Sequence, residues 1–496
     1  MGEEVGQLFN SRPGEGLAPA GVHSKRDCSR DGDQYWKCEQ VFEQGVNTRE
    51  SYYQLIPEKV FNELPAIEEL LRSEIKGFSP DYLKEVISII ACHTRKDDKE
   101  DSPLRSEYLR RLVPYAERYL NGLIQLEIIK RSPNYIPGQI SYRYNFMSEY
   151  QSKYVSLPLK NAKLIHRIKK AHSEIGKDAV KLIWGYASQV KYLKQLTLAE
   201  GWQDIVESFK EDINQYNAIL ASAIRIVNGD IFYSRDGTEG RFHSNITNMK
   251  RELRQYLRIN NKPLTNIDIK NSQPYLSTII LTYPSKVAWL AKNITLSMLL
   301  QTLKVSLTED VKKYIYLVAN GQFYEYLIQE FAYEGLELTR DETKRQVLRI
   351  LFAPNRLPKN EINRKCRLIF KDRFPTVHRI FSKVRGRDQG TKFENSNRFA
   401  ILLATIESYL LLDVIVKKIN KELPHVIVVT IHDSIMTGIL TDDVEAVRKI
   451  MSEELTSFVG FAPKIEIEDY SNYLEEKRRE ESIIIQYDVT SLVSLS

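Results

Sequence analysis

The sequence predicts an α+β fold, and two features indicate it. Segments that alternate or run apolar in the manner of β-strands lie at 264–270, 425–431, 435–440 and 464–468. Stretches with apolar residues three and four positions apart, the helical period, lie at 284–334, 340–352, 398–420 and 442–458. Because these strands and helices interleave, we expect one sheet with helices on one of its faces.

The composition is that of an ordinary globular protein. The 496 residues are 42% hydrophobic and 27% charged, which suggests about three domains and excludes a chain disordered throughout. The longest apolar stretch, 400–416, is interrupted by Glu407 and Asp413, so we expect no membrane partner. The start lacks a secretory signal pattern and the four cysteines form no tight pair, which predicts a cytoplasmic protein. A net charge of +6 does not by itself identify a nucleic-acid partner.

The first part of the chain divides into a leader and a mainly helical domain. Residues 1–47 lack periodicity and are interpreted as a disordered leader. Within 48–156, helical periods at 57–72, 79–94 and 106–131 precede two short strands in 132–146. This order resembles a winged helix-turn-helix domain, which implies DNA binding; a helical docking domain gives the same pattern.

Residues 157–227 are predicted to form two long helices with a basic surface. Between 151 and 200 there are ten lysines and arginines against three carboxylates. Such a stretch can bind a phosphate backbone, and a solvated helix face has the same composition. The remaining chain divides into 228–473, which carries the candidate catalytic residues, and a tail, 474–496, that begins charged and turns apolar.

Two aspartates stand at the ends of predicted strands. The apolar runs around His432, Asp433 and Ser434 predict a hairpin with these polar residues at its tip. Asp268 lies at the end of another strand. An isolated Asp at a hairpin tip is most often an ordinary turn residue. Two carboxylates that meet across a sheet, however, can hold two divalent cations for phosphoryl transfer.

The predicted helix at 340–352 carries side chains suited to a triphosphate. Arg340, Lys344 and Phe352 are spaced by four and eight residues, which keeps them near one face. Two cations there can bind phosphates, and the ring can lie against a base. An amphipathic surface helix with its apolar residues in the core gives the same pattern.

Taken in order, these elements resemble the palm and fingers of family A DNA polymerases and of the related single-subunit phage-type RNA polymerases. In that superfamily a strand ends in a metal-binding Asp, a fingers helix carries Arg, Lys and an aromatic at the spacing seen here, and a hairpin carries His-Asp. The segment from Gly240 to Ser244, with Asn248 and Met249 beyond, resembles the segment before the first Asp. The helix at 398–420 stands at the place of the template-contacting helix, with Glu407 near the family's Gln.

The resemblance implies a fold and a set of roles. It covers about 228–473 as palm and fingers, with the basic helices of 157–227 as a thumb, and leaves no room before the palm for a proofreading exonuclease. The implied catalytic residues are Asp268, Asp433 and Lys344. The implied nucleotide-binding residues are Arg340, Lys344, Phe352 and Gln273. The implied primer and template residues are Arg241, Ser244, Asn248, Glu407 and His432. The implied metal ligands, for two Mg²⁺ ions with Mn²⁺ as a substitute, are Asp268, Asp433 and Ile269.

Four positions depart from the DNA polymerase pattern. Gln273 stands where those enzymes have the Glu that excludes a ribose 2′-hydroxyl, and Leu348 replaces an aromatic. Phe352-Ala353 replaces Tyr-Gly, and Ser434 follows His-Asp as in phage-type RNA polymerases. Because Phe352 lacks the hydroxyl that RNA polymerases use, we expect deoxynucleotides to be preferred.

The function expected from the resemblance is template-directed nucleotidyl transfer. It implies a DNA polymerase that uses a primer-template and nucleoside triphosphates in the replication of a phage, plasmid or integrated element. Two alternatives stay open. One is a non-catalytic replication initiator on the same scaffold, and the other is a single-subunit RNA polymerase or primase-like enzyme.

Overall fold

The computed structural model describes residues 52–93, 102–103, 106–132, 142–171, 187–235, 237–386, 397–438 and 440–469. All of them belong to one compact unit, Asn47–Ser496. The predicted leader at 1–47 and the predicted tail at 474–496 lie outside the described residues. The described chain is a mixed α+β fold, as the sequence predicts.

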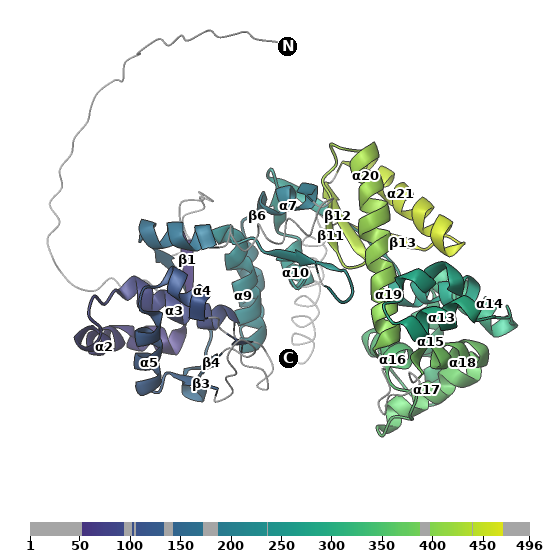
Figure 1. The fold of residues 1–496 in the computed structure, drawn as a ribbon, viewed down its shortest axis with the longest axis horizontal. Helices are drawn as coiled ribbons and strands as arrows, with labels where there is room; N and C mark the ends of the chain where they lie inside the picture. The colour runs from purple at the N-terminus through teal and green to yellow at the C-terminus, as the bar shows by residue number, and fades with distance from the viewer. Residues whose placement is uncertain are drawn as a thin grey trace, which may run out of the picture. The chain divides into compact units, whose positions relative to one another are not determined.

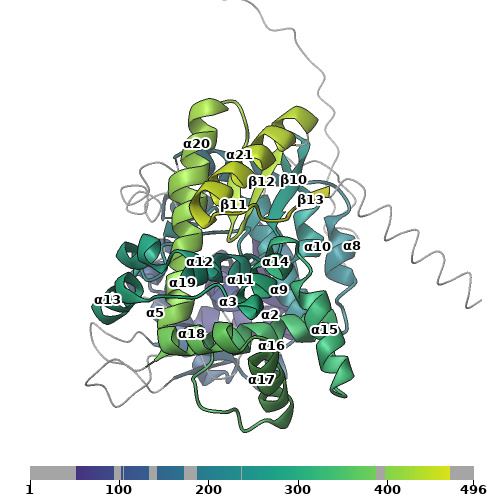
Figure 2. The same cartoon turned by 90° about the vertical axis from the view of Figure 1, so that its right-hand side faces the viewer.

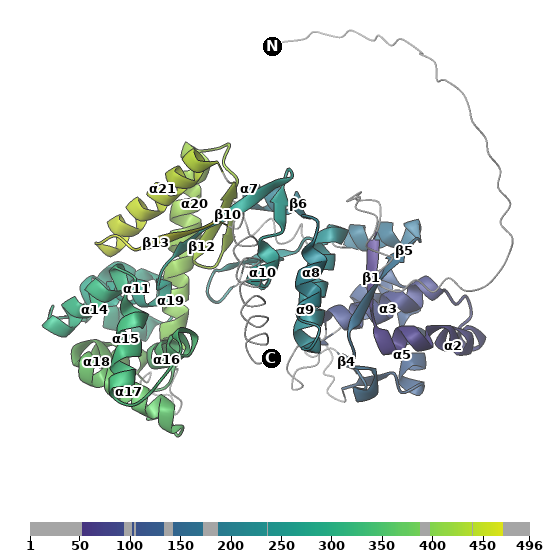
Figure 3. The same cartoon turned by 180° about the vertical axis from the view of Figure 1, so that it is seen from behind.

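The N-terminal part joins two small sheets to a group of helices (Figures 1 and 3). β1 pairs antiparallel with β5, and a three-stranded antiparallel sheet has the order β2-β4-β3. The elements are β1 (Tyr52–Pro57), α2 (Glu58–Glu74), α3 (Pro80–His93), β2 (Ser102–Pro103), α4 (Ser106–Leu112), α5 (Ala116–Gln125), β3 (Ile129–Arg131), β4 (Arg143–Phe146), η1 (Ser148–Tyr150) and β5 (Tyr154–Leu159).

The sequence predicts one continuous helix over 106–131, and this prediction is wrong. It divides into α4 and α5, and its last residues form β3. Pro114 lies at the break, where it supplies no N–H and disfavours helical geometry at Val113. Tyr115 then takes a left-handed φ of 57°, which turns the chain into α5. Of the two strands predicted in 132–146, β4 is present, and 133–141 lies outside the described residues.

The prediction of two long helices over 157–227 is also wrong. The described part of this region contains the end of β5, a helical stretch at 162–171, three separate helices and a strand. Strand β6 pairs with β9, so that Leu196 and Leu198 stand opposite Ile259 and Leu257, all buried. This pairing joins the region to the central sheet. The elements are α7 (Ala187–Leu193), β6 (Leu196–Leu198), α8 (Trp202–Glu207) and α9 (Ile213–Asn228).

The central sheet is antiparallel and is built on β10. Its order is β11-β12-β10-β9-β6, and β13 pairs with β10 as well. The four strands predicted from the sequence are β10, β11, β12 and β13, with β11 beginning at Val429 rather than at 425. The strands and the segments before them are β7 (Tyr233–Arg235), β8 (Phe242–Ser244), α10 (Arg251–Arg254), β9 (Leu257–Ile259), β10 (Lys262–Ile269), β11 (Val429–Ile431), β12 (Ser434–Gly438) and β13 (Ile465–Asp469).

Both faces of this sheet are buried, which corrects the expectation of helices on one face only. Leu264 and Met436 point into one hydrophobic cluster, shared with the N-terminal part. Ile267 and Ile435 point into a second cluster, shared with the C-terminal helices. Because side chains alternate along a strand, Asp268 shares the face of Leu264. The aspartate therefore lies at the end of β10 on the face that points toward the first cluster.

A group of helices follows β10 and returns to β11 (Figures 1 and 2). They are α11 (Ser272–Ser277), α12 (Ile279–Thr282), η2 (Pro284–Leu290), α13 (Ile294–Thr302), α14 (Glu309–Ala319), α15 (Phe323–Tyr333), α16 (Arg340–Phe352), α17 (Glu361–Arg373), α18 (Pro375–Arg385), α19 (Arg398–Ser408), the π-helical η3 (Tyr409–Ile415), α20 (Val416–Glu422) and, between β12 and β13, α21 (Thr441–Val459). Helix α16 has the bounds that the sequence predicts.

Helices α19, η3 and α20 form one continuous helix, Arg398–Glu422. By length and composition alone it passes as a membrane span, and 72% of its most apolar window is buried inside the protein. That burial is what the central helix of a folded core shows. Figure 1 shows the helix running from its α20 end, beside α21, to its α19 end, beside α16.

Candidate active site

Asp268 and Asp433 are brought together by strand pairing. Asp268, the penultimate residue of β10, stands opposite Ser434, the first residue of β12. Asp433 immediately precedes Ser434 in the two-residue turn between β11 and β12, and His432 opens that turn with a φ of 50°. On its other side Asp268 stands opposite Glu466 of β13.

The ionised forms of the two aspartates are unfavourable in the folded protein, because both carboxyls have a raised pKa. Burial raises the pKa of Asp268, and the negative charges of Asp433, Glu468 and Glu466 raise it further. Burial also raises the pKa of Asp433, although its backbone, Lys344, Arg241 and Ser272 oppose the rise. Carboxylates crowded in this way hold protons more tightly than usual and gain most from a nearby cation.

Lys344 supplies one such positive charge from helix α16. Lys344 is exposed, and its positive charge lowers the pKa of both Asp268 and Asp433. The start of α16 is fixed by a capping box, in which Thr339 Oγ1 accepts from Glu342 N at 3.3 Å and Glu342 Oε2 accepts from Thr339 N at 2.9 Å. This cap sets where the helix begins and hence which side chains share Lys344's face.

Two buried arginines hold the other end of α16. Arg385 from α18 donates to the carbonyls of Ile350 and Leu351, the latter at 2.9 Å. Arg367 from α17 donates to the carbonyls of Arg349 and Pro354, at 3.3 and 2.6 Å. The Ile350 and Leu351 carbonyls belong to the last turn of α16, and the Arg349 carbonyl also accepts from Ala353 N at 2.9 Å. The two arginines thus bind the end of the helix and fix it against its neighbours.

Arg340 lies at the start of α16 in contact with α15. Its Nε donates to Glu325 Oε1 at 3.1 Å, and its guanidinium lies 5.6 Å from the centroid of the Tyr324 ring. Burial raises the pKa of Tyr324, with Arg340 opposing and Asp433 adding to the rise. The charges of Arg340 and Asp433 thus both act on the phenol of Tyr324, in opposite directions.

Phe352, at the other end of the helix, is half-buried. Its ring packs edge-on against Phe399 of α19, with centroids 6.2 Å apart. The structure thus ties Phe352 to the apolar core of the C-terminal helices, and part of the ring stays accessible.

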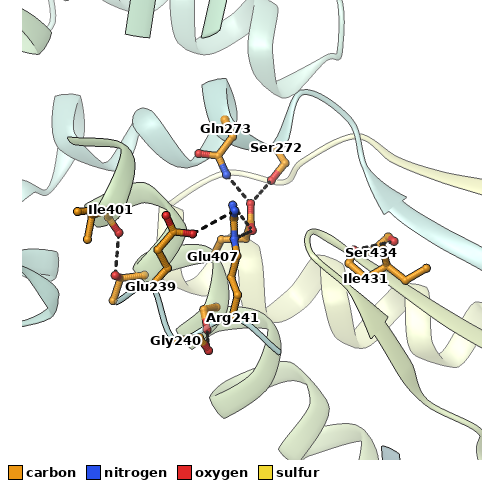
Figure 4. A network of polar contacts seen from close by, with 11 residues as sticks. Glu239, Gly240, Arg241, Ser272, Gln273, Ile401, Glu407, Ile431 and Ser434 are labelled. Atoms are coloured by element: carbon orange, nitrogen blue, oxygen red, sulfur yellow. Dashed lines mark hydrogen bonds and ion pairs between the residues drawn. The ribbon is translucent and has the colours of Figure 1, made fainter. Parts of the chain in front are cut away.

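Glu407 joins two side chains that the sequence analysis singled out separately, Arg241 and Gln273, and also contacts Ser272 (Figure 4). It is 3% exposed, and its Oε1 accepts from Arg241 Nε at 3.0 Å and Nη2 at 2.8 Å. Its Oε2 accepts from Gln273 Nε2 and from Ser272 Oγ, the latter at 3.4 Å. Burial raises the pKa of Glu407, and Arg241 opposes the rise. With its oxygens occupied inside the protein, Glu407 positions Arg241 and Gln273 and does not itself reach a template.

A close contact between Gly240 and the Ser408 side chain accompanies this network. Gly240 has a φ of 74°, and a Cβ there would lie 3.2 Å from Ser408 Oγ. Ser408 Oγ donates to the Gly240 carbonyl, and Arg235 Nη2 contacts Asp413 Oδ2 at 2.8 Å. The loop before β8 is thereby fastened along the long helix, which brings Arg241 to Glu407.

His432 lies against the segment that precedes β10. Its ring is edge-on to His243, with centroids 6.0 Å apart. Burial lowers the pKa of His432 to about 4, with Arg241, His243 and Arg254 adding to the effect, so the ring is neutral at neutral pH. Its Nδ1 is buried without a hydrogen-bond partner among the described residues.

The remaining predicted residues differ in accessibility. Asn248 is exposed, as a template contact requires. Ser244 is fully buried and its amide donates to Thr247 Oγ1 at 2.9 Å, so the predicted contact with primer or template does not fit this conformation. Ile269 is 3% exposed and its side chain lies in the apolar core, so only its main chain is available to a metal.

Sequence reasoning missed Glu466, Glu468 and Tyr324. The alternation of Ile and Glu in 464–468 predicts a strand with both glutamates on one face, but it does not say that β10 is the neighbour. Across the described ranges, no three or more His, Cys, Asp or Glu side chains are grouped so as to hold a metal ion on their own.

The comparisons with known proteins give little beyond this geometry. No family model and no curated protein matches the chain. Among solved structures it is similar to the POL domain of Pol1 from M. smegmatis in complex with DNA primer-template and dNTP, at 12% sequence identity and a TM-score of 0.27. The match covers 61% of this chain and 65% of that chain, just under two thirds of its length. A likeness this weak carries no inference about the site.

Proposed function

We propose that this protein is a template-directed nucleotidyltransferase, and specifically a DNA polymerase of the family A type. The observation that carries the proposal is the pairing of β10 with β12, which sets Asp268 beside Asp433. The positive charge of Lys344 lowers the pKa of both carboxyls. Two carboxylates and an opposing cation are the elements that phosphoryl transfer needs for positioning and charge stabilisation. We assign residues 228–473 to the palm and fingers, with α16 as the fingers helix.

The donor set suits Mg²⁺. Asp268 and Asp433 are hard oxygen donors whose pKa values are raised by burial, and a divalent cation relieves that cost. Phosphate oxygens of the substrate and water would supply the remaining ligands of a bound Mg²⁺. Asp268, Asp433 and the main chain of Ile269 would hold two ions. When bound, these ions supply the charge that activates a primer 3′-hydroxyl and stabilises the leaving pyrophosphate.

The side chains around the pair receive roles from their positions. Lys344 and Arg340 bind the triphosphate, and Arg340 exchanges Glu325 for a phosphate when it does so. Lys344 also donates a proton to the leaving group. Phe352 presents the accessible part of its ring to the incoming base.

The primer terminus and the sugar are assigned to the other side of the pair. We assign the neutral ring of His432 to orienting the primer end. Arg241 and Asn248 contact primer and template, and Gln273 lies under the nucleotide sugar.

Extension of a labelled primer on a template with a 5′ overhang tests the proposal. The full chain, with Mg²⁺ and the four deoxynucleotides, should add nucleotides in the order that the template dictates. A parallel reaction with ribonucleotides tests the RNA polymerase alternative. If neither nucleotide set is incorporated with Mg²⁺ or Mn²⁺ while the protein binds the primer-template, the non-catalytic initiator becomes the better interpretation.

A further inference from the structure

The end of helix α9 joins strand β1 of the N-terminal part to the hairpin of β7 and β8. Asn228, the last residue of the helix, is buried, and its side chain contacts β1. Its Oδ1 accepts from Tyr53 N at 2.8 Å, and its Nδ2 donates to the Tyr53 carbonyl at 2.8 Å. In the β1-β5 sheet Tyr53 stands opposite Pro158, which has no N–H to donate. The Asn228 amide therefore pairs with β1 as a neighbouring strand would, and Figure 3 shows α9 beside β1.

The chain turns directly after Asn228 and makes a second contact with β1. Gly229 takes a left-handed φ of 70°, which glycine adopts without strain, and its N–H donates to the Ile226 carbonyl at 3.0 Å. Asp230 follows, and its Oδ2 accepts from the hydroxyl of the buried Tyr52 at 2.7 Å. Two successive residues of β1 are thus held by the last turn of α9 and the residue that leaves it.

Asn245 continues this connection to the hairpin. Its side chain is buried, its Nδ2 donates to the Asp230 carbonyl at 2.8 Å, and its Oδ1 accepts from Phe232 N at 2.8 Å. Asn245 directly follows β8, where Ser244 pairs with Tyr233 of β7. One buried amide therefore fixes the end of β8 to the chain that leaves α9.

The same hairpin carries two residues of the candidate site. Arg241 directly precedes β8 and binds Glu407, and His243 lies within β8, edge-on to His432. Strand β8 also packs beside β11, which leads into the turn that holds His432 and Asp433. A series of hydrogen bonds therefore runs from β1, through the end of α9, to the strand that lies against His432.

We propose that Asn245 is a positioning residue for the primer end, and that Asn228 and Asp230 couple the position of β1 to it. The inference rests on the proposed function only in assigning Arg241 and His432 to the primer. A buried polar group that loses its partner costs more free energy than an exposed one. A shift of β1 against α9, or of α9 against β8, would leave buried amide and carbonyl groups unpaired. The three elements therefore move together, and a change in the N-terminal part reaches the candidate site.

Hydrogen exchange of the full chain measures this coupling independently of activity. Asn228→Ala removes both bonds to Tyr53, and it should raise the exchange of the β1 amides. If the coupling exists, the amides of 242–247 should also exchange about fivefold faster, the factor that one neutral hydrogen bond contributes. Tyr52→Phe removes only the bond to Asp230 and should raise exchange at 242–247 about twofold. This milder variant keeps the test possible if Asn228→Ala does not fold.

Asn217→Ala is the matched control. Asn217 lies in the first half of the same helix and makes the same two-point contact with the N-terminal part. It accepts from Tyr154 N at 2.7 Å and donates to the Ser152 carbonyl at 2.9 Å. Because these bonds lead to β5 and not to the hairpin, Asn217→Ala should leave exchange at 242–247 unchanged.

Primer extension tests the positioning role of Asn245. Asn245→Ala should raise the KM for the primer-template about fivefold, because it removes the bonds that fix β8. It should leave the KM for the nucleotide unchanged, because α16 is not part of the connection. A KM does not depend on the fraction of the protein that is folded, so a loss of stability alone moves neither constant. Asn217→Ala should change neither KM.

Two results of the exchange experiment would overturn the coupling. One is wild-type exchange at 242–247 in Asn228→Ala and Tyr52→Phe, and the other is an equal rise in Asn217→Ala. An unchanged KM for the primer-template in Asn245→Ala would overturn the positioning role. If the wild type incorporates no nucleotide while Asn228→Ala still raises exchange at 242–247, the nucleotidyltransferase proposal fails and the coupling stands.

Discussion

Arg241 and Glu407 lie 166 positions apart and form a two-point ion pair, with Nε and Nη2 of the arginine 3.0 and 2.8 Å from one carboxylate oxygen. The pair fastens the segment before β8 to the long helix α19. Because Glu407 also accepts from Gln273, one buried carboxylate connects the strand segment, the start of α11 and the central helix. A substitution that breaks this ion pair should therefore change both the free energy of unfolding and the geometry of the site.

Arg241→Ala should lower the free energy of unfolding by about 1–3 kcal/mol, because it leaves the buried Glu407 without its cation. The value is below that of a fully buried pair, since the Arg241 side chain is 24% exposed. Urea denaturation measures the loss. Adding Glu407→Gln to Arg241→Ala should recover most of it. Arg448→Ala, which breaks an exposed pair with Glu445, is the control and should change stability by less than about 1 kcal/mol.

Asp268→Asn and Asp433→Asn should each abolish nucleotide incorporation while the fold persists. Each removes an anionic oxygen from a site whose bound cations stabilise the transition state by several kcal/mol, which is a loss of at least about 10³-fold in kcat. Single-turnover primer extension measures it. Asp442→Asn, an exposed aspartate at the start of α21, should extend like wild type. Near-normal extension by either site variant would remove the two-carboxylate assignment.

Asp268→Asn should also make the metal-free protein more stable at alkaline pH. The folded state raises the pKa of Asp268, chiefly through burial, so it binds this proton more tightly than the unfolded chain does. Wild-type stability must then fall as pH rises from the ordinary carboxyl pKa of about 4 through the raised folded value, and the Asn variant lacks this loss. Melting temperatures at pH 6 and pH 8.5 should diverge accordingly. Added Mg²⁺ should reduce the difference in melting temperature between wild type and Asp268→Asn at pH 8.5, because it stabilises the wild type. An unchanged difference would contradict the proposed cation site.

Lys344→Ala should raise the KM for the nucleotide and lower kcat, whereas Arg340→Ala should act mainly on KM. Lys344 faces charge that develops only as pyrophosphate leaves, and Arg340 meets phosphate already present in the ground state. Steady-state extension with a single nucleotide separates the two effects. Arg345→Ala provides the control, because Arg345 is an exposed cation one residue along the same helix. Unchanged kinetics in both Lys344→Ala and Arg340→Ala would make α16 an ordinary surface helix.

Part of the structure could be predicted correctly from local sequence patterns. The apolar runs around His432 and Asp433 gave the β11 and β12 hairpin, and the cap at Thr339 and Glu342 agrees with α16 beginning at Arg340. In both cases the deciding interactions lie within a few residues of one another. Such interactions leave a readable spacing in the sequence.

Strand pairing and side-chain contacts between distant segments could not be predicted from the sequence in the same way. β1 forms only because β5 is its neighbour, and β6 because it meets β9. Arg385, which holds the end of α16, looks like any helical arginine until its burial is known. Glu407 could be placed on the long helix from its period, but its contacts with Arg241 and Gln273 depend on how three distant segments pack.

The margin between deoxy- and ribonucleotides should depend on Gln273 and on the residue that holds it. Its Nε2 donates one N–H to Glu407, so the carbonyl oxygen and the second N–H of the amide are the groups left to face a nucleotide. That oxygen fills space beneath the sugar but also accepts a hydrogen bond from a 2′-hydroxyl, unlike a gate that only repels it. We therefore expect deoxynucleotides to be preferred by a smaller margin than an acidic gate gives. Gln273→Ala should reduce the preference for deoxynucleotides. Glu407→Gln should reduce it to a smaller extent, because it weakens the hydrogen bond that holds the Gln273 amide.

The ratio of kcat/KM for matched deoxy- and ribonucleotides on one primer-template measures this margin. Gln301→Ala, an exposed glutamine on α13, should leave the ratio unchanged. If Glu407→Gln leaves this kcat/KM ratio unchanged, the hydrogen bond between Gln273 and Glu407 does not contribute to sugar selection. The size of the Gln273 side chain would then be its only basis. A wild-type preference for ribonucleotides would reverse the assignment, because Ser434 after His432 and Asp433 would then be the better guide to the enzyme than Phe352.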